Sequence, residues 1–290
     1  MKASSSEKLF YTMNYILLAI AGLSCLLPLI HIVSLSLSDY HAVVSGQVFL
    51  WPVRWTVDAY VTLIEGTNIV RAFQNSVVIT VVGVALSMSF TIMAAYPLSR
   101  NYFFLRRFFS LAAVFTMLFN GGLIPTYLIM SNLGLVNTYA VLWLLGLVSV
   151  FNMMVLRTSF ESLPPEIDEA ARMDGCGEWR YLFRIVLPLS LPVLATLTLF
   201  YGVAYWNAFI SVLIYINDSH RLNLTVLVQQ MVQSQSLLSE VNQQSSDVMS
   251  LTPESMKSAG IIIMVLPMLI VYPFLQRYFV KGVMIGAIKS

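Results

Sequence analysis

The chain has 290 residues, of which 58% are hydrophobic and 10% are charged, and its formal net charge is +2. Soluble globular proteins carry about 25% charged residues, so this composition excludes a water-soluble fold and predicts an integral membrane protein. The small net charge and the lack of any run of Lys and Arg argue against a nucleic-acid-binding protein.

The N-terminal apolar run is too long for a signal-peptide core and lacks a small-residue cleavage pattern, so we expect a retained first span. A helix of about 20 apolar residues crosses the hydrocarbon core, and backbone groups in lipid must be paired internally. The sequence therefore predicts an all-α integral membrane protein, with a single transmembrane domain of six helices at residues 14–36, 74–98, 108–130, 138–156, 189–216 and 259–280.

The distribution of Lys and Arg predicts the orientation of these spans. With the N-terminus in the cytoplasm, the inner segments hold twelve Lys and Arg residues and the outer segments hold four, as the positive-inside rule requires. Both termini and residues 157–188 are then cytoplasmic, and residues 38–73 and 217–258 are external.

The third predicted span is interrupted by Asn120-Gly121-Gly122, followed by Pro125. Gly and Pro open the intrahelical hydrogen-bond ladder, and such breaks need neighbouring helices or a water-lined cavity to satisfy the backbone. We expect a kink here, which serves either helix packing or the shape of a translocation path.

Cysteine and histidine form no pattern typical of a disulfide framework or a metal site. Cys25 lies in an apolar run and Cys176 in a charged segment, so we expect free thiols. The three histidines show no ligand spacing, so no metal site is predicted.

Residues 157–188 are charged and yet contain helix signals. Pro164-Pro165 starts a first short helix, and Gly175 suits the left-handed position that ends it. A second helix with one apolar stripe is predicted by the spacing of Trp179, Leu182, Phe183 and Val186. The pair either rests on its own bundle as a solvated loop or docks onto a partner, with the small side chains at 170 and 171 allowing close approach and the charges setting the orientation.

The pattern Glu169-Ala170-Ala171, Gly175, Ile185 and Leu187-Pro188 resembles the EAA loop of ABC importer permeases. The stretches FNGGLIPTYL, FNMMVLR and YFVKGVMIGAIK are similar to the carbohydrate-uptake permeases for oligosaccharides, a subgroup that includes alginate and pectin-fragment systems. The resemblance implies a type I ABC importer permease fold in the bacterial cytoplasmic (inner) membrane, with a two-helix coupling loop that docks onto the ATP-binding subunit. The docking residues would be Glu169, Ala170, Ala171, Asp174, Gly175, Trp179, Phe183, Ile185, Leu187 and Pro188.

The resemblance also implies the partners: a second permease subunit, two ATP-binding subunits and an extracytoplasmic sugar-binding protein. The chain has no Gly-Lys dipeptide and therefore no P-loop, so we expect a non-catalytic subunit without a cofactor, with ATP and Mg bound by its partners. No carboxylate lies well inside a predicted span, which argues against an ion-coupled secondary transporter. A permease of the same architecture for a non-sugar solute is the remaining alternative.

Sugar-binding sites combine aromatic faces with amide and hydroxyl groups, because a sugar ring offers both C–H patches and hydroxyls. The candidates in the predicted spans are Asn120, Asn152, Tyr205, Trp206 and Asn207. Polar side chains in lipid also join helices, so each candidate is either a sugar contact or a packing residue.

Overall fold

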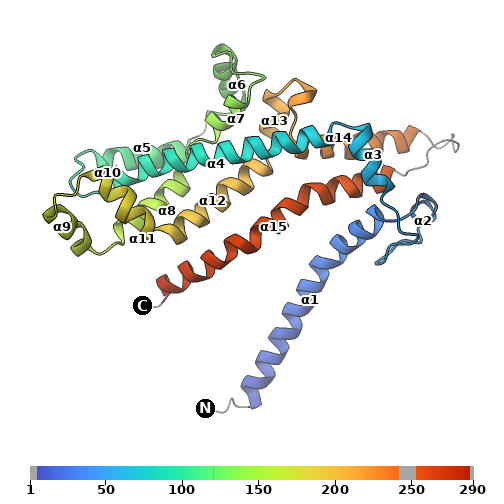
Figure 1. Ribbon diagram of the computed structural model, residues 1–290, viewed down its shortest axis with the longest axis horizontal. Coiled ribbons are helices and arrows are strands. Elements are labelled where there is room, and N and C mark those ends of the chain that lie inside the picture. The colour runs from blue at the N-terminus through green and yellow to red at the C-terminus, as the bar shows by residue number, and fades with distance from the viewer. Residues whose placement is uncertain (1–4, 120, 242–252, 288–290) are drawn as a thin grey trace. The chain divides into compact units, whose positions relative to one another are not determined.

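The computed structural model describes residues 5–119, 121–241 and 253–287. Within these residues the regular structure is helical, apart from one isolated antiparallel bridge between Ser38 and Trp55 (Figure 1). The predicted all-α architecture is confirmed. The chain divides into two compact units, Met1–Val70 with Leu227–Leu266 and Arg71–Val226 with Pro267–Ser290.

Three helices are long and apolar enough to cross a membrane alone: α1 (Ser5–Ser36), α4 (Ile69–Ser99) and α15 (Pro253–Ala287). Three bent pairs pass the same test when their members are joined: α5 (Arg106–Leu118) with α6 (Leu123–Asn132), α7 (Tyr139–Leu145) with α8 (Val150–Glu161), and Glu178–Leu189 with α12 (Leu191–Trp206). By length and composition, the described residues therefore hold three to six elements that could span a membrane. The third, fourth and fifth predicted spans are broken, not continuous.

In the first unit, the segment that follows α1 folds back onto the last turns of that helix. It contains α2 (Tyr40–Val44) and α3 (Asp58–Gly66). The Ser34 hydroxyl donates to the Leu50 carbonyl (2.8 Å), and the Ser36 and Tyr60 hydroxyls share a hydrogen bond of 2.8 Å. These bonds satisfy polar side chains at the end of an otherwise apolar helix.

The same unit contains most of α14 (Leu224–Val241) and the first part of α15. A Cβ atom built on Gly260 would lie 3.4 Å from Cγ2 of Val228, so the two helices pack closely at this glycine.

The break in the third span lies where the sequence predicts it. α5 ends at Leu118 and α6 begins at Leu123, with Gly122 at a φ of +86° just before it. Pro125 sits in the first turn of α6, where its missing N–H leaves no intrahelical bond unmade. Glycine at a positive φ followed by proline therefore produces the interruption.

In the fourth span, α7 and α8 meet at 54°. The Ser149 side chain accepts a bond from the Asn152 N–H at the start of α8 (3.4 Å), and the Ser149 N–H donates to the Tyr201 hydroxyl (2.9 Å). The backbone freed by the break is thus partly satisfied by a neighbouring helix, as burial in lipid demands.

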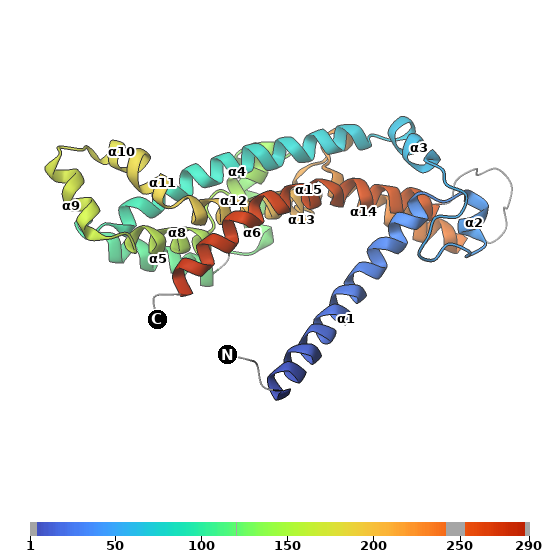
Figure 2. The same cartoon turned by 60° about the horizontal axis from the view of Figure 1, so that its bottom comes forward.

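The second unit has two apolar clusters. One includes Ala95 of α4, Leu156 of α8 and Leu197 of α12, and α9 (Pro165–Met173), α10 (Glu178–Tyr181) and α11 (Leu187–Leu189) pack against it. The other includes Val141 of α7 and Val212 of α13 (Ile210–Tyr215). Figures 1 and 2 show α9, α10 and α11 gathered at the end of α4 near the start of α5.

Candidate functional site

The first helix of the charged segment forms as predicted. Pro165 is the first residue of α9, where its lack of an N–H costs no hydrogen bond. The helix ends in a Schellman motif, in which the Gly175 N–H donates to the Arg172 carbonyl (3.0 Å) and the Cys176 N–H donates to the Ala171 carbonyl (2.9 Å). Gly175 has a φ of +68°, so its predicted left-handed conformation is confirmed.

The second helix is less regular. It starts with α10, passes through a π-helical turn at Leu182–Val186 and ends with α11. In a regular α-helix the ring of Pro188 would clash with the carbonyl of Arg184, and the wider π turn directly before the proline accommodates it. The whole element meets α12 at 82°, so it does not continue the direction of that span.

Residues 164–189, which we call the two-helix segment, have an inner and an outer face. The inner face is buried in a cluster with α4 and α8 and consists of Ala171, Tyr181, Leu182 and Val186. The outer face is exposed and consists of Glu169, Ala170, Met173, Asp174, Trp179 and Phe183. The most exposed apolar side chains there are Met173 (88%) and Trp179 (66%), and the Trp179 and Phe183 rings stack with centroids 6.1 Å apart.

Two expectations for this segment are corrected by this arrangement. The predicted single stripe is split, because Leu182 and Val186 face inward while Trp179 and Phe183 face outward. Tyr181, which directly precedes the π turn, is buried together with Leu182 and Val186. Ala171 packs inside its own chain instead of presenting a small side chain to a partner.

The remaining predicted docking residues differ in exposure. Ile185 and Leu187 are half-buried, whereas Gly175 and Pro188 are exposed.

A polar cluster holds the two-helix segment against the end of α4. Arg100 directly follows that helix and is only 9% exposed. Its guanidinium carbon lies 4.5 Å from the ring centroid of Tyr96 and 4.9 Å from that of Tyr181. One of its terminal nitrogens is 3.6 Å from the carboxylate of Asp168.

Glu178 belongs to the same cluster. It accepts a hydrogen bond of 2.5 Å from the Tyr96 hydroxyl and another from Tyr102. Burial, and then the bond to Glu178, raise the pKa of Tyr102 to about 12. Burial pushes the pKa of Glu178 upward, but the two tyrosine hydrogen bonds together with Arg100 and Arg172 outweigh it and hold that pKa below its usual value. Glu178 is therefore an anion facing cations at neutral pH.

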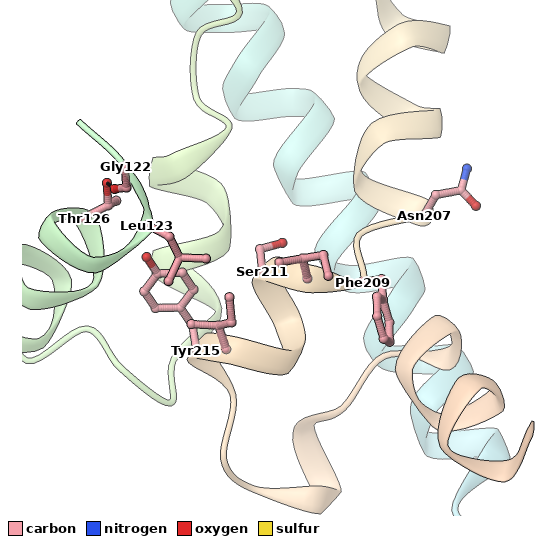
Figure 3. A pocket seen from close by; sticks show the side chains of 9 residues that line it. Gly122, Leu123, Thr126, Asn207, Phe209, Ser211 and Tyr215 are labelled. Atoms are coloured by element: carbon pink, nitrogen blue, oxygen red, sulfur yellow. Dashed lines mark hydrogen bonds between the residues drawn. The ribbon is translucent and has the colours of Figure 1, made fainter. Parts of the chain in front are cut away.

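Two cavities open beside the broken spans of the second unit. One, of about 540 Å³, is bordered by Ser149, Asn152, Phe200 and Tyr205, among others. The other, of about 580 Å³, lies between α6 and α13 (Figure 3), and Ser211 lines both. Their walls combine aromatic rings with amide and hydroxyl groups, which is the chemistry that sugar recognition uses.

Three of the candidate sugar contacts lie on these walls. Asn152 and Tyr205 line the first cavity and Asn207 lines the second. In Figure 3 the Asn207 side chain points away from Tyr215, and its amide donates to the Val203 carbonyl of its own helix (3.1 Å).

The other two candidates are placed differently. Trp206 is buried, and its ring meets that of Phe73 edge to face with centroids 6.0 Å apart. Asn120 lies outside the described residues. Because Tyr205, Trp206 and Asn207 are consecutive, the helix directs their side chains to three different sides.

Sequence reasoning missed Arg100 in the polar cluster and Phe200, Ser211 and Tyr215 on the cavity walls. A single Arg after an apolar run is the ordinary positive-inside signal, so the sequence pattern carried no mark of its burial. Aromatic residues in spans are equally common in packing. For these residues, the local sequence contains no signal that distinguishes a functional side chain from one that only packs.

Metal-binding side chains do not gather in the part of the chain that the structure describes, where no group of three or more His, Cys, Asp or Glu residues could hold an ion. Cys25 and Cys176 are both free thiols.

Residues 3–285 match the family model described as binding-protein-dependent transport system inner membrane component. The chain is 38% identical over 286 residues to the polygalacturonan/rhamnogalacturonan transport system permease protein YtcP of Bacillus subtilis, covering 98% of this chain and 99% of that protein. It is also 38% identical over 293 residues to protein LplC of the same organism, covering 100% of this chain and 98% of LplC.

Among solved structures, the chain is similar to one from the crystal structure of a bacterial ABC transporter involved in the import of the acidic polysaccharide alginate. The TM-score is 0.87 at 32% sequence identity, covering 96% of this chain and 99% of the other. The fold is therefore that of the ABC importer permeases.

Proposed function

The chain belongs to the family of binding-protein-dependent transport system inner membrane components, and from this premise we propose that it is a permease subunit of an ATP-driven importer of oligosaccharides. It forms half of the translocation pathway, and a second permease subunit forms the other half. Two ATP-binding subunits and an extracytoplasmic sugar-binding protein complete the complex. ATP and Mg²⁺ bind to the ATP-binding subunits, so this chain has no catalytic role of its own.

The exposed outer face of the two-helix segment is the main support for docking of an ATP-binding subunit. Its inner face is already packed against α4 and α8, whereas Met173, Trp179 and Phe183 are exposed, and so is Glu169. Large apolar side chains grouped beside charges are typical of a protein-binding surface. We propose that the ATP-binding subunit covers this face.

The connections of this segment suggest how ATP hydrolysis moves the permease. Three residues separate α8 from α9, and one residue separates α11 from α12. Connections this short leave little freedom, so a displacement of the docked segment is passed to α8 and α12. We propose that these two helices act as levers that open the pathway alternately to either side.

For the substrate, we propose an oligosaccharide of the uronate or pectin-fragment type. Support comes from the names of the similar proteins, which refer to polygalacturonan, rhamnogalacturonan and alginate. The cavities offer Phe200 as a stacking face and Asn152 and Ser211 as polar partners. Tyr205 lies at the same wall.

We also propose that the two-helix segment and both termini lie in the cytoplasm. In a Cys25→Ser background, an impermeant maleimide added to sealed right-side-out vesicles is expected to label Gln47→Cys, which is exposed in the first unit. Cys176 is expected to react after permeabilisation only. Labelling of Cys176 in the sealed vesicles would reverse the proposed orientation.

The proposed function is tested with the reconstituted complex of this chain, its second permease, the ATP-binding subunits and the binding protein. In proteoliposomes, galacturonate or alginate oligosaccharides are expected to stimulate ATP hydrolysis several-fold, with uptake of the labelled sugar. Maltodextrins serve as neutral-sugar controls, and amino acids serve as non-sugar controls. Stimulation by a non-sugar solute, with none by any saccharide, would refute the sugar assignment.

A further inference from the structure

The buried guanidinium of Arg100 is unusual for a residue at the end of a membrane-spanning helix. Such arginines ordinarily extend into water or toward lipid headgroups. Arg100 instead is 9% exposed, and within the described residues its Nε and one terminal nitrogen have no hydrogen-bond acceptor. A buried charge with unsatisfied donors raises the free energy of the folded protein, so a guanidinium at this position requires compensating contacts.

The compensation comes from the two-helix segment. Tyr181 of α10 and Tyr96 of α4 lie near the guanidinium at cation–π distance, and Asp168 of α9 supplies the counter-charge at 3.6 Å. Separating α9 from α4 would remove the counter-charge of Asp168, and separating α10 would remove the aromatic contact of Tyr181, so either movement breaks a favourable contact of the guanidinium.

Further contacts surround the guanidinium of Arg100 and its partners. Glu178 of α10 accepts a hydrogen bond from the Tyr96 hydroxyl. Arg172 of α9 pairs with Asp168 at 3.2 Å, and its guanidinium carbon lies 4.8 Å from the ring centroid of Tyr102, just beyond α4. Each short helix of the segment is thus joined to the end of α4 by at least two side-chain contacts.

We propose that Arg100 is a positioning residue that couples α4 to the two-helix segment, making α4 a third moving span. This inference rests on the proposed function. α8 and α12 are joined to the segment through the backbone, but α4 is separated from it by α5 to α8 in the sequence. The Arg100 clamp, defined as Tyr96, Arg100, Asp168 and Tyr181, supplies the missing connection. Movement of α9 and α10 on ATP binding then carries α4 with it.

The experiment compares Arg100→Met with Arg100→Lys in the complete reconstituted complex. Methionine removes the charge, so co-purification of the ATP-binding subunits is expected to stay within about twofold of wild type while sugar uptake per ATP hydrolysed falls about tenfold or more. Lysine keeps the charge but loses the planar stacking on two rings, so an intermediate ratio is expected.

Glu161→Gln is the matched control. Glu161 pairs with Arg157 (3.0 Å) and Arg106 (3.7 Å) in a second ionic cluster that joins α5 to α8 without touching α9 or α10. Its removal is expected to leave the ratio of uptake to ATP hydrolysis unchanged. An equal fall in this control would show that the ratio responds to any local loosening and would overturn the proposal.

Tyr181 provides a second test if Arg100→Met does not fold. Tyr181→Phe keeps the aromatic face and should couple normally, whereas Tyr181→Leu removes it and should lower the ratio. Normal coupling in Tyr181→Leu and in the folded Arg100 variants would overturn the proposal. Uptake by the wild-type complex tests the proposed function by itself, so its failure is distinguishable from failure of the clamp.

Discussion

Reversing the charge of Glu169 is expected to abolish sugar uptake while leaving the permease folded and inserted. Glu169 is exposed on the outer face of the two-helix segment and forms no ion pair with any residue that the structure describes. If the ATP-binding subunit meets it with a basic or polar group, Glu169→Lys replaces a desolvated attraction with repulsion. Losing one member of such a pair costs about 2–5 kcal/mol, which corresponds to a roughly 30-fold or greater loss of affinity. Co-purification of the ATP-binding subunit and coupled ATP hydrolysis measure the effect.

Arg107→Glu is the control for this charge reversal. Arg107 is also exposed, but it lies in the first turn of α5 and outside the two-helix segment. Assembly is expected to survive this change. Wild-type assembly and uptake with Glu169→Lys would show that the outer face is not the docking surface.

The same docking prediction can be tested through the backbone with two glycines. Gly175 has a φ of +68° and Gly177 a φ of −69°, and a Cβ built on either would meet no atom within 4 Å. Substitution by valine at 175 therefore costs about 1–2 kcal/mol or more through the left-handed conformation alone, whereas Gly177→Val avoids this strain. We expect Gly175→Val to disturb the Schellman motif and weaken assembly, and Gly177→Val to leave both intact. Equal behaviour of the two variants would contradict a role for the turn.

The ends of α9 were predictable because they depend on local backbone chemistry. Proline at a first helical position and glycine at a left-handed one are dictated by their own φ restrictions, whatever surrounds them. The break of the third span was predictable for the same reason, since Gly122 takes the positive φ that glycine tolerates.

The faces of the second short helix were not predictable from the spacing of its apolar residues. A regular period of 3.6 puts Trp179 and Leu182 on one stripe, but tertiary packing buries Leu182 while Trp179 remains exposed. The π turn at Leu182–Val186 then changes the spacing of the residues that follow. Pro188 indicates that the helix is irregular at this point. The sequence alone does not predict that the preceding turn becomes a π turn, which avoids the clash between the proline ring and the carbonyl of Arg184.

The role of polar residues in the spans was also left open by the sequence, since sugar contacts and helix contacts use the same side chains. Tyr205 illustrates the difficulty, because it lines a cavity and is at the same time bonded through its hydroxyl to Ser87 (2.9 Å). Only the neighbours of a side chain can separate these roles, and they come from α4 and from the break between α7 and α8, far away in the sequence.

The packing of Tyr205 leads to the largest expected effect on stability. A Cβ on Gly146 would lie 2.9 Å from the Tyr205 hydroxyl oxygen, and a Cβ on Gly83 would lie 2.8 Å from its ring carbons. Tyr205 is buried and its hydroxyl is held by Ser87, so the ring cannot move aside without losing that bond. Overpacking of this kind costs about 1–3 kcal/mol. We therefore expect Gly146→Ala and Gly83→Ala each to lower the free energy of unfolding, measured by denaturant titration in detergent.

Tyr205→Phe distinguishes this steric explanation from a general loss of helix contacts. The phenylalanine lacks the oxygen that lies nearest to a Cβ at residue 146 (2.9 Å) and leaves only ring carbons at 3.2 and 3.4 Å, but it keeps the ring carbons that a Cβ at residue 83 would meet at 2.8 Å. In the Tyr205→Phe background, Gly146→Ala is therefore expected to cost at least about 1 kcal/mol less than in the wild type, a coupling within the range for residues in contact. Gly83→Ala keeps its clash with the ring carbons in both backgrounds, so its cost should fall by less than that of Gly146→Ala. Gly202→Ala is the control, since its Cβ would meet Val84 at an ordinary 3.9 Å and should be tolerated in either background. Additive costs for Gly146→Ala and Tyr205→Phe would mean that the hydroxyl does not limit the space at Gly146.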